Sequence, residues 1–246
     1  MGIREPAHKV IERYLRQLIS KGAGRTEPLP GEVELADMFG VSRMTVRQAF
    51  NSLVAAKLVV RYRSKGSFAT VQVLEDVSTL ATEDFLTRWT AQGHEVSMQV
   101  LCFEERRPPR RVAERFGIGA DGMLSYIERL RLVDGVALAW DQRWMPTEFG
   151  RRVTAGDLAT TSLFSLLVAH GFGVADMSFE IHAHAATAEQ AQRLGCARNG
   201  TVLRREIVCT APGGESIIVG TSEYPAERVT YRARLTFDAS YQPTHL

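Results

Sequence analysis

The stretch that most constrains this chain is LADMFGVSRMTVRQAF, residues 35–50. Leu35 and Phe39 have helical spacing, Gly40 can adopt the left-handed conformation that ends a helix, and Ser42 can cap a helix that follows it. The sequence therefore predicts two short helices joined by a tight turn.

The second of these helices is expected to have an apolar and a polar face. Its inward-facing residues, spaced three or four apart, are Val46, Ala49, Phe50 and Leu53. Arg43, Arg47 and Gln48 then point outward from the first turns. Such a helix, preceded by a supporting helix, has the geometry of a helix-turn-helix that enters the DNA major groove. The alternative is an αα-hairpin with a solvated charged face.

The distribution of charge favours a nucleic-acid partner for this part of the chain. The formal net charge of the 246 residues is only +2, but residues 1–70 hold 12 Lys and Arg against 6 Asp and Glu, whereas the remainder holds 18 against 22. Every lysine lies at or before Lys65. Positive charge is thus concentrated where DNA phosphates would be neutralised.

A basic hairpin is expected directly after the helix-turn-helix. Residues 58–63 and 67–71 have the composition of strands and flank a turn at residues 64–66. Basic side chains on such a wing contact phosphates or the minor groove, although the same pattern also describes an exposed hairpin without a ligand. The predicted DNA contacts are Ser42, Arg43, Thr45, Arg47, Gln48, Arg61, Arg63, Lys65 and Gly66.

Motifs at fixed positions connect residues 7–71 to a known family. They are Leu29-Pro30-Gly31-Glu32, Glu34-Leu35-Ala36, Gly40-Val41-Ser42-Arg43, Thr45-Val46-Arg47, Ala49, Leu53 and Gly66-Ser67-Phe68. This region resembles the winged helix-turn-helix of GntR-type bacterial transcription regulators, which implies that Arg43 and Arg47 contact DNA. Val33, Met44 and Ser64 depart from the family's usual arginine, threonine and glycine, which implies an unusual operator.

The rest of the chain alternates strands and short helices. Strands are expected at 95–105, 123–133, 136–145, 174–186, 201–210, 215–224 and 232–237, and helices at 7–20, 82–92, 110–116, 162–170 and 187–194. Asp134-Gly135 and residues 211–214 mark hairpin turns. The sequence predicts an α+β protein: a winged domain over residues 1–71, a linker at 72–79, and a domain at 80–246 with a largely antiparallel sheet.

A second set of motifs lies in this larger domain. They are Glu128-Arg129-Leu130-Arg131-Leu132, Asp134-Gly135, Ser162-Leu163-Phe164, Gln190-Ala191, Leu194-Gly195 and Tyr224. Residues 80–235 resemble the UTRA ligand-binding domain of the HutC branch of GntR regulators, whose fold is like that of chorismate lyase without the enzyme activity. The resemblance places Arg129, Arg131, Asp141, Ser162 and Tyr224 in the effector pocket.

The residue types in this pocket favour an anionic effector. Arg129 and Arg131 alternate onto one face of a strand, where two guanidinium groups can bind a carboxylate or phosphate; a solvated sheet face is the alternative. Ser162 adds a hydroxyl at the start of a helix. Asp141 and Glu180 are further candidates for hydrogen bonds to the effector.

Two observations bear on which anion binds. Ile218 stands where sugar-phosphate-binding members of the family tend to carry Glu, and Trp140 and Trp144 are close in sequence to the pocket. Together they favour an apolar or aromatic acid over a polyhydroxylated sugar.

Catalysis and metal binding find little support. His182 and His184 share a strand face with Glu180, but three residues on one strand rarely close a tetrahedral metal site. The chain lacks a Gly-x-Ser-x-Gly elbow, a P-loop and a dinucleotide fingerprint. We therefore expect no metal, no cofactor and no enzyme activity. A chorismate-lyase-like enzyme fused to a DNA-binding domain, and a DNA-binding protein with an inert dimerisation domain, remain the alternatives.

Cysteine content and hydropathy indicate the compartment. Cys102, Cys196 and Cys209 are odd in number and lack metal-ligand spacing, which favours a reducing environment. The sequence predicts neither a signal peptide nor a membrane span. The combined prediction is a cytoplasmic homodimeric repressor that binds palindromic operator DNA and is released by a small anionic metabolite.

Overall fold

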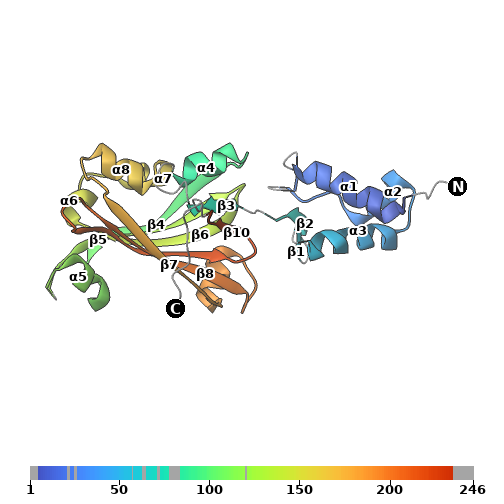
Figure 1. The fold of residues 1–246 in the computed structure, drawn as a ribbon. Coiled ribbons are helices and arrows are strands. Elements are labelled where there is room, and N and C mark those ends of the chain that lie inside the picture. Colours follow the sequence, from blue (N-terminus) through green and yellow to red (C-terminus); the bar gives the residue numbers. More distant parts are fainter. Residues whose placement is uncertain are drawn as a thin grey trace, which may run out of the picture.

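The computed structural model describes residues 5–20, 23–24, 27–56, 58–62, 65–70, 73–77, 84–119 and 121–234. It contains a helical N-terminal domain with a two-stranded wing and a larger domain built on a six-stranded sheet (Figure 1). The predicted α+β class is confirmed. Within the described ranges, no helix combines the length and the apolar character needed to cross a membrane.

Three helices form the N-terminal domain: α1 (Ala7–Ser20), α2 (Glu32–Phe39) and α3 (Arg43–Ala55). The turn between α2 and α3 forms as predicted, because Gly40 has φ 62° and the Ser42 hydroxyl accepts a hydrogen bond from the Thr45 amide at 3.2 Å. The domain core contains Ile11, Leu15, Leu29, Leu35, Val46, Ala49, Phe50 and Leu53. Glu12, on the charged face of α1, is nevertheless buried, since Lys9 and Arg16 both pair with it.

The wing consists of strands β1 (Val59–Tyr62) and β2 (Gly66–Ala69), which pair antiparallel. Gly66 has φ 106°, a region that favours glycine, and a Cβ atom there would lie 2.9 Å from Cβ of Pro28. The wing turn is therefore packed against the segment that leads into α2. Arg63 and Ser64, both considered in the sequence, lie outside the described residues.

Six antiparallel strands form the sheet of the larger domain in the order β4-β5-β6-β9-β8-β7. Their bounds are β4 (Val96–Arg106), β5 (Leu124–Val133), β6 (Val136–Met145), β7 (Asp176–Ala185), β8 (Thr201–Thr210) and β9 (Ser216–Pro225). Asp134 (φ 51°) and Gly135 (φ 73°) make the predicted tight turn between β5 and β6. All six strands were expected from the sequence.

Short helices cover both faces of this sheet. They are α4 (Phe85–Ala91), α5 (Arg110–Phe116), α6 (Thr147–Gly150), α7 (Ala155–Thr160), α8 (Leu163–Ala169) and α9 (Ala188–Leu194). The sequence did not predict α6 and α7, because four and six residues are too few to show a helical period.

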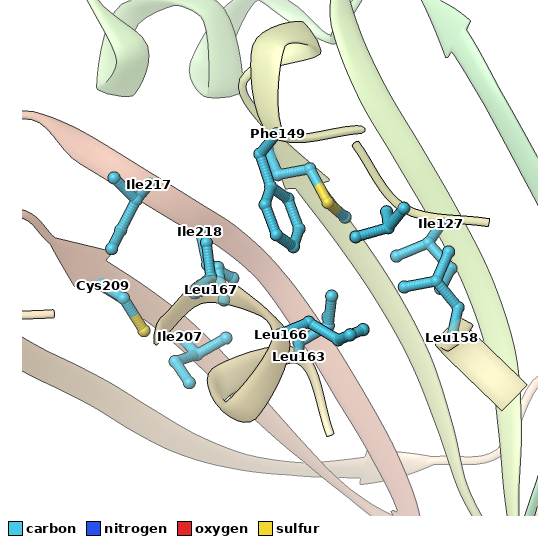
Figure 2. Packing of buried hydrophobic residues seen from close by; sticks show 12 residues of the cluster. Ile127, Phe149, Leu158, Leu163, Leu166, Leu167, Ile207, Cys209, Ile217 and Ile218 are labelled. Atoms are coloured by element: carbon cyan, nitrogen blue, oxygen red, sulfur yellow. The ribbon is translucent and has the colours of Figure 1, made fainter. Parts of the chain in front are cut away.

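The largest apolar cluster lies between the sheet and helices α6 to α8. In Figure 2, Phe149 and Leu167 from the helices point toward Ile127 and Ile218 from strands β5 and β9. Phe149, Leu167 and Ile127 are fully buried. This cluster fixes the helices on the face of the sheet that carries the candidate ligand site.

Two further strands form a separate parallel pair, β3 (Val73–Asp76) with β10 (Val229–Arg232). Residues 73–76 lie within the stretch expected to be a linker, and the last strand was expected at 232–237, later than it occurs. Residues 235–246 lie outside the described part. The chain between the domains is thus anchored on the larger domain before α4 begins.

Candidate functional site

The outer face of α3 carries the predicted DNA-contacting side chains. Arg43, Arg47 and Gln48 are exposed, and the Ser42 and Thr45 hydroxyls lie 2.9 Å apart at the helix start. Val46 and Phe50 face the core and so fix the rotation of the helix. The helix therefore presents a row of polar side chains to solvent, in the arrangement that a major-groove helix requires.

Glu32 connects the recognition helix to the wing. Its carboxylate lies 3.1 Å from Nη2 of Arg47 and 3.4 Å from Nη2 of Arg61. Arg61 also lies over the Phe50 ring at 5.3 Å. The ion pair with Glu32 raises the pKa of Arg47, first through the hydrogen bond and then through charge. Sequence reasoning did not assign this positioning role to Glu32.

Wing residues Lys65 and Gly66 are exposed beside this cluster. Arg43, by contrast, has no ion pair within the described ranges, so its guanidinium remains available to an outside acceptor. The structure thus brings together all described members of the predicted DNA-binding set on α3 and the adjoining wing.

A buried charge cluster lies in the larger domain at the centre of the sheet. Arg131, on β5, donates from Nη2 to Asp141 Oδ1 at 2.9 Å and to Tyr224 Oη at 2.6 Å. Its Nε atom lies 2.9 Å from Asp141 Oδ2. Arg131 and Asp141 are each 2% exposed, and Tyr224 is fully buried. Three of the predicted pocket residues are therefore in direct contact.

Arg143 and Ser222 complete the contacts of Asp141. Ser222 donates from Oγ to Asp141 Oδ1 at 2.7 Å, and Arg143 donates to Ser222 Oγ at 2.6 Å. Burial would raise the pKa of Asp141, but the charges of Arg131, Arg143 and Arg129 and the Ser222 hydrogen bond outweigh it and hold this pKa below its ordinary value. Asp141 is therefore an anion that three arginines share.

Arg129 is the least compensated member of the cluster. Its Nε atom is 3.6 Å from Asp141 Oδ2 and makes no hydrogen bond within the described part of the chain, while Nη1 donates to the Leu158 carbonyl at 3.0 Å. Burial lowers the pKa of Arg129 to about 10, which the charge of Asp141 only partly offsets. The side chain stays charged at neutral pH, with unused donor capacity.

A second ion-pair group adjoins the first. Glu75, on β3, is fully buried, and its Oε2 lies 2.9 Å from Arg88 Nη2 and 3.7 Å from Arg205 Nη1. Arg205 stacks over Tyr224 at 5.7 Å, which places the two groups side by side. The segment between the domains therefore inserts a carboxylate into the positively charged interior.

The whole region has a surplus of positive charge. Its arginines are at most 8% exposed and number five: Arg88, Arg129, Arg131, Arg143 and Arg205. Among the described residues, the buried carboxylates that pair with these arginines are Asp141 and Glu75, so arginine outnumbers carboxylate here. Phe85 and Trp89 of α4 cover the Arg131 guanidinium at 4.7 and 5.1 Å from its carbon. Such a closed, cationic interior suits an anionic ligand.

Ser162 lies at the edge of this region as the N-cap of α8. Its Oγ accepts from the Ser165 amide at 3.1 Å and donates to Ser165 Oγ, which in turn donates to Asp84 at the start of α4. Ser162 is 1% exposed. Its described hydrogen bonds thus join α8 to α4, and none of them reaches the arginines.

Glu180 is not brought to this site. The strand register places it on the opposite face of the sheet from Asp141, and its side chain is 76% exposed, 3.3 Å from His182. Trp140 and Trp144 also face the opposite side, because residues adjacent to Asp141 alternate across the sheet. These tryptophans therefore give no support to an aromatic acid as the effector. Within the described residues, no group of His, Cys, Asp and Glu has metal-binding geometry.

Several residues of the buried charge cluster were not predicted from the sequence. Arg143 and Arg205 share the strand parity of Asp141 and Ser222, a signal that was available once the register was known. Glu75 had no signal, because its partners Arg88 and Arg205 come from distant segments. Long-range pairing decides these contacts.

Known proteins match both halves of the chain. The UTRA domain matches residues 91–230, and the family described as "Bacterial regulatory proteins, gntR family" matches residues 7–69. The HTH-type transcriptional repressor NagR of Bacillus subtilis is 28% identical over 236 residues, 92% of this chain and 93% of that protein. The regulator Rv0792c of Mycobacterium tuberculosis is 27% identical over 234 residues, covering 92% and 84%.

The fold is similar to that of solved regulators. PhnF from Mycobacterium smegmatis superposes with a TM-score of 0.63 at 19% identity, covering 93% of this chain and all of that one. The UTRA match alone spans more than half of the chain, and the gntR match covers the helix-turn-helix and wing. The chain therefore belongs to the GntR family of DNA-binding bacterial transcription regulators, in the group that carries a UTRA domain.

Proposed function

We propose that this protein is a homodimeric cytoplasmic repressor that binds a palindromic operator and leaves it when a small anionic metabolite binds the larger domain. The winged domain, proposed at residues 1–71, binds DNA, and residues 80–246 bind the effector and dimerise. Similarity to the repressor NagR over nearly the full length supports repression. The observation that carries the effector proposal is that three buried arginines share the one carboxylate of Asp141 while the Nε atom of Arg129 makes no hydrogen bond among the described residues.

The DNA-binding half of the proposal rests on the outer face of α3. Arg43 and Arg47 read base edges from its first two turns, while Arg61, Arg63 and Lys65 contact phosphates. One such helix covers only a few base pairs, so two-fold symmetry and half-sites about one helical turn apart supply the remaining contacts.

The effector half rests on unused donors. An anionic group placed beside Arg129 would accept from its unpaired Nε and offset the excess charge, which no described protein group does. The ligand class is a carboxylate or phosphate metabolite. Arg129, Arg131 and Tyr224 are its proposed contacts, with Asp141 holding the arginines in place and Ser162 near the α4–α8 contact.

The signal reaches the DNA-binding domain through β3. Glu75 already serves as an internal anion for Arg88 and Arg205, and β3 directly follows the wing in the chain. An effector anion that takes over these charges weakens the hold on β3, which frees the winged domain to reorient. The effector can drive release only if it binds the reoriented arrangement more tightly than the DNA-bound one. Such couplings typically change operator affinity by about 5–150-fold.

The test measures operator affinity with and without candidate effectors. An operator selected from random DNA is titrated with wild type and Arg129→Met against sugar phosphates, aliphatic acids and aromatic acids. We expect one class to weaken wild-type binding by about 5–150-fold. Arg129→Met should bind the operator as wild type does and resist release, because methionine keeps the packing but loses the charge.

Arg204→Met is the matched control. Arg204 lies on the opposite face of the sheet, paired with Glu223 at 2.7 Å, so its loss should leave release unchanged. If Arg129→Met releases at the wild-type effector concentration, the pocket is elsewhere. If no anion alters either operator affinity or thermal stability, the larger domain is an inert dimerisation module.

A further inference from the structure

Large apolar side chains are exposed on the helices of the winged domain. Among the described residues of α2 and α3 they are Val33, Met38, Met44 and Val54. Single exposed apolar residues are common on protein surfaces and need no partner. Met44 differs from such residues in its place, because it lies in the first turn of the recognition helix and is 67% exposed there.

The helical period sets the direction in which Met44 points. The buried residues of α3 are Val46, Ala49, Phe50 and Leu53. At about 100° per residue, Met44 lies about 170° from the centre of this buried face. Arg43 and Arg47 lie to one side of it, and Gln48 follows it one turn later. Met44 therefore occupies the middle of the face that enters the major groove.

Several polar groups around Met44 already have partners within the protein. The Ser42 and Thr45 hydroxyls lie 2.9 Å apart, and Ser42 Oγ also accepts from the Thr45 amide at 3.2 Å. Arg47 donates from Nε and Nη2 to Glu32 at 3.3 and 3.1 Å. Met44 itself has no donor, and its thioether is only a weak acceptor. A base beneath Met44 is therefore recognised by packing and not by hydrogen bonding.

We infer that Met44 recognises a thymine in each operator half-site through the C5 methyl group of that base. Thymine alone among the four bases presents a methyl group in the major groove. The unbranched thioether side chain adapts to irregular apolar surfaces. A cytosine or purine edge at this place would bury the same side chain against polar atoms that it cannot satisfy. This inference rests on the proposed base reading by α3 and adds one base of the operator.

Val33 borders the same surface from α2. It is 53% exposed and follows Glu32, whose carboxylate lies 3.1 Å from Arg47 of α3 and 3.4 Å from Arg61 of the wing. These ion pairs hold the start of α2 beside the recognition helix. Val33 is thus at the margin of the DNA-contacting surface, whereas Met44 is at its centre. Met44 is therefore the side chain assigned to the methyl group, and variants of both residues separate their roles.

Replacing single thymines of the operator by uracil tests the inference. Uracil lacks only the C5 methyl group and keeps the O4 acceptor that thymine shows in the major groove. Full-length protein is titrated by anisotropy with an operator selected from random DNA and with its uracil-substituted forms. Burying one methyl group contributes about fourfold in affinity, so we expect uracil at one thymine position in both half-sites to weaken binding about 15-fold.

Met44→Ala identifies the side chain that reads the methyl group. Alanine favours the helix and removes the apolar contact, so this variant should bind the thymine and uracil operators equally, within about twofold. Val168→Ala is the matched control. Val168 is also 67% exposed but lies on α8 of the larger domain, so its variant should keep the full response to uracil.

The possible results separate this inference from the proposed function. A uracil response that persists in Met44→Ala would come from DNA shape or from another residue and would overturn the inference. Loss of the response in Val33→Ala alone would assign the methyl group to Val33 and overturn it as well. If wild type prefers the operator to random DNA yet tolerates uracil at every thymine, the inference is wrong while base reading by α3 stands. A wild type without that preference would overturn both.

Discussion

Replacing Glu75 by glutamine tests whether the interior is organised around its excess of arginine. The substitution keeps the size of the side chain but removes the negative charge that Arg88 and Arg205 share. The excess of buried positive charge then rises by one. Removing one partner of a buried ion pair costs about 3–5 kcal/mol, and the glutamine oxygen can still accept from Arg88, so we expect the lower end.

This loss has two measurable consequences. For a chain of this size 1 kcal/mol corresponds to about 2–4 °C, so Tm should fall by about 6–12 °C in chloride buffer. Because Glu75→Gln leaves more uncompensated charge, sulfate or phosphate at matched ionic strength should raise the Tm of the variant by more than that of wild type.

Glu223→Gln is the control for this experiment. Glu223 is also buried, at 2% exposure, but it lies on the opposite face of the sheet with Arg204 and His184. Its variant should lose stability without a gain in anion response. The reasoning is refuted if Glu75→Gln unfolds within about 2 °C of wild type, or if anions stabilise both variants equally.

Three further outcomes are expected. Arg43→Ala should cost about 1–3 kcal/mol in operator binding and relax the preference at one base pair of each half-site; equal weakening on operator and random DNA, measured by anisotropy, would contradict base reading. Gly66→Ala should destabilise the winged domain by about 1–3 kcal/mol in thermal unfolding, because φ is 106° and Pro28 lies in the way, whereas Gly31→Ala, with open space around it, should be nearly neutral. The pKa of Asp141 in the folded protein is held below its ordinary value, so ionised Asp141 stabilises the fold fully above about pH 4. This stabilisation is lost as the pH falls toward the lowered pKa of the folded state. Tm should therefore drop on acidification below about pH 4 and not between about pH 7 and 5.

The sequence determined the elements whose signals are local. The α2–α3 turn follows from Gly40 and Ser42, and the β5–β6 hairpin from Asp134 and Gly135, because each feature depends on backbone preferences within a few residues. The placement of Arg129 and Arg131 on one face of a strand could likewise be predicted from the sequence. The outward row of Arg43, Arg47 and Gln48 followed from the apolar period of α3.

Only the tertiary structure decided what faces what across the sheet. Trp140 could have been assigned to the other face from strand alternation alone, because it adjoins Asp141 in a predicted strand. Glu180 is on a different strand, so the register across β7, β8, β9 and β6 was needed to place it on the face opposite Asp141. Strand β3 escaped prediction because four residues gain their order from β10, more than 150 positions away. Glu75 belongs to the charged interior for that reason alone: its carboxylate is stable there only because Arg88 and Arg205, from α4 and β8, converge on it once the chain has folded.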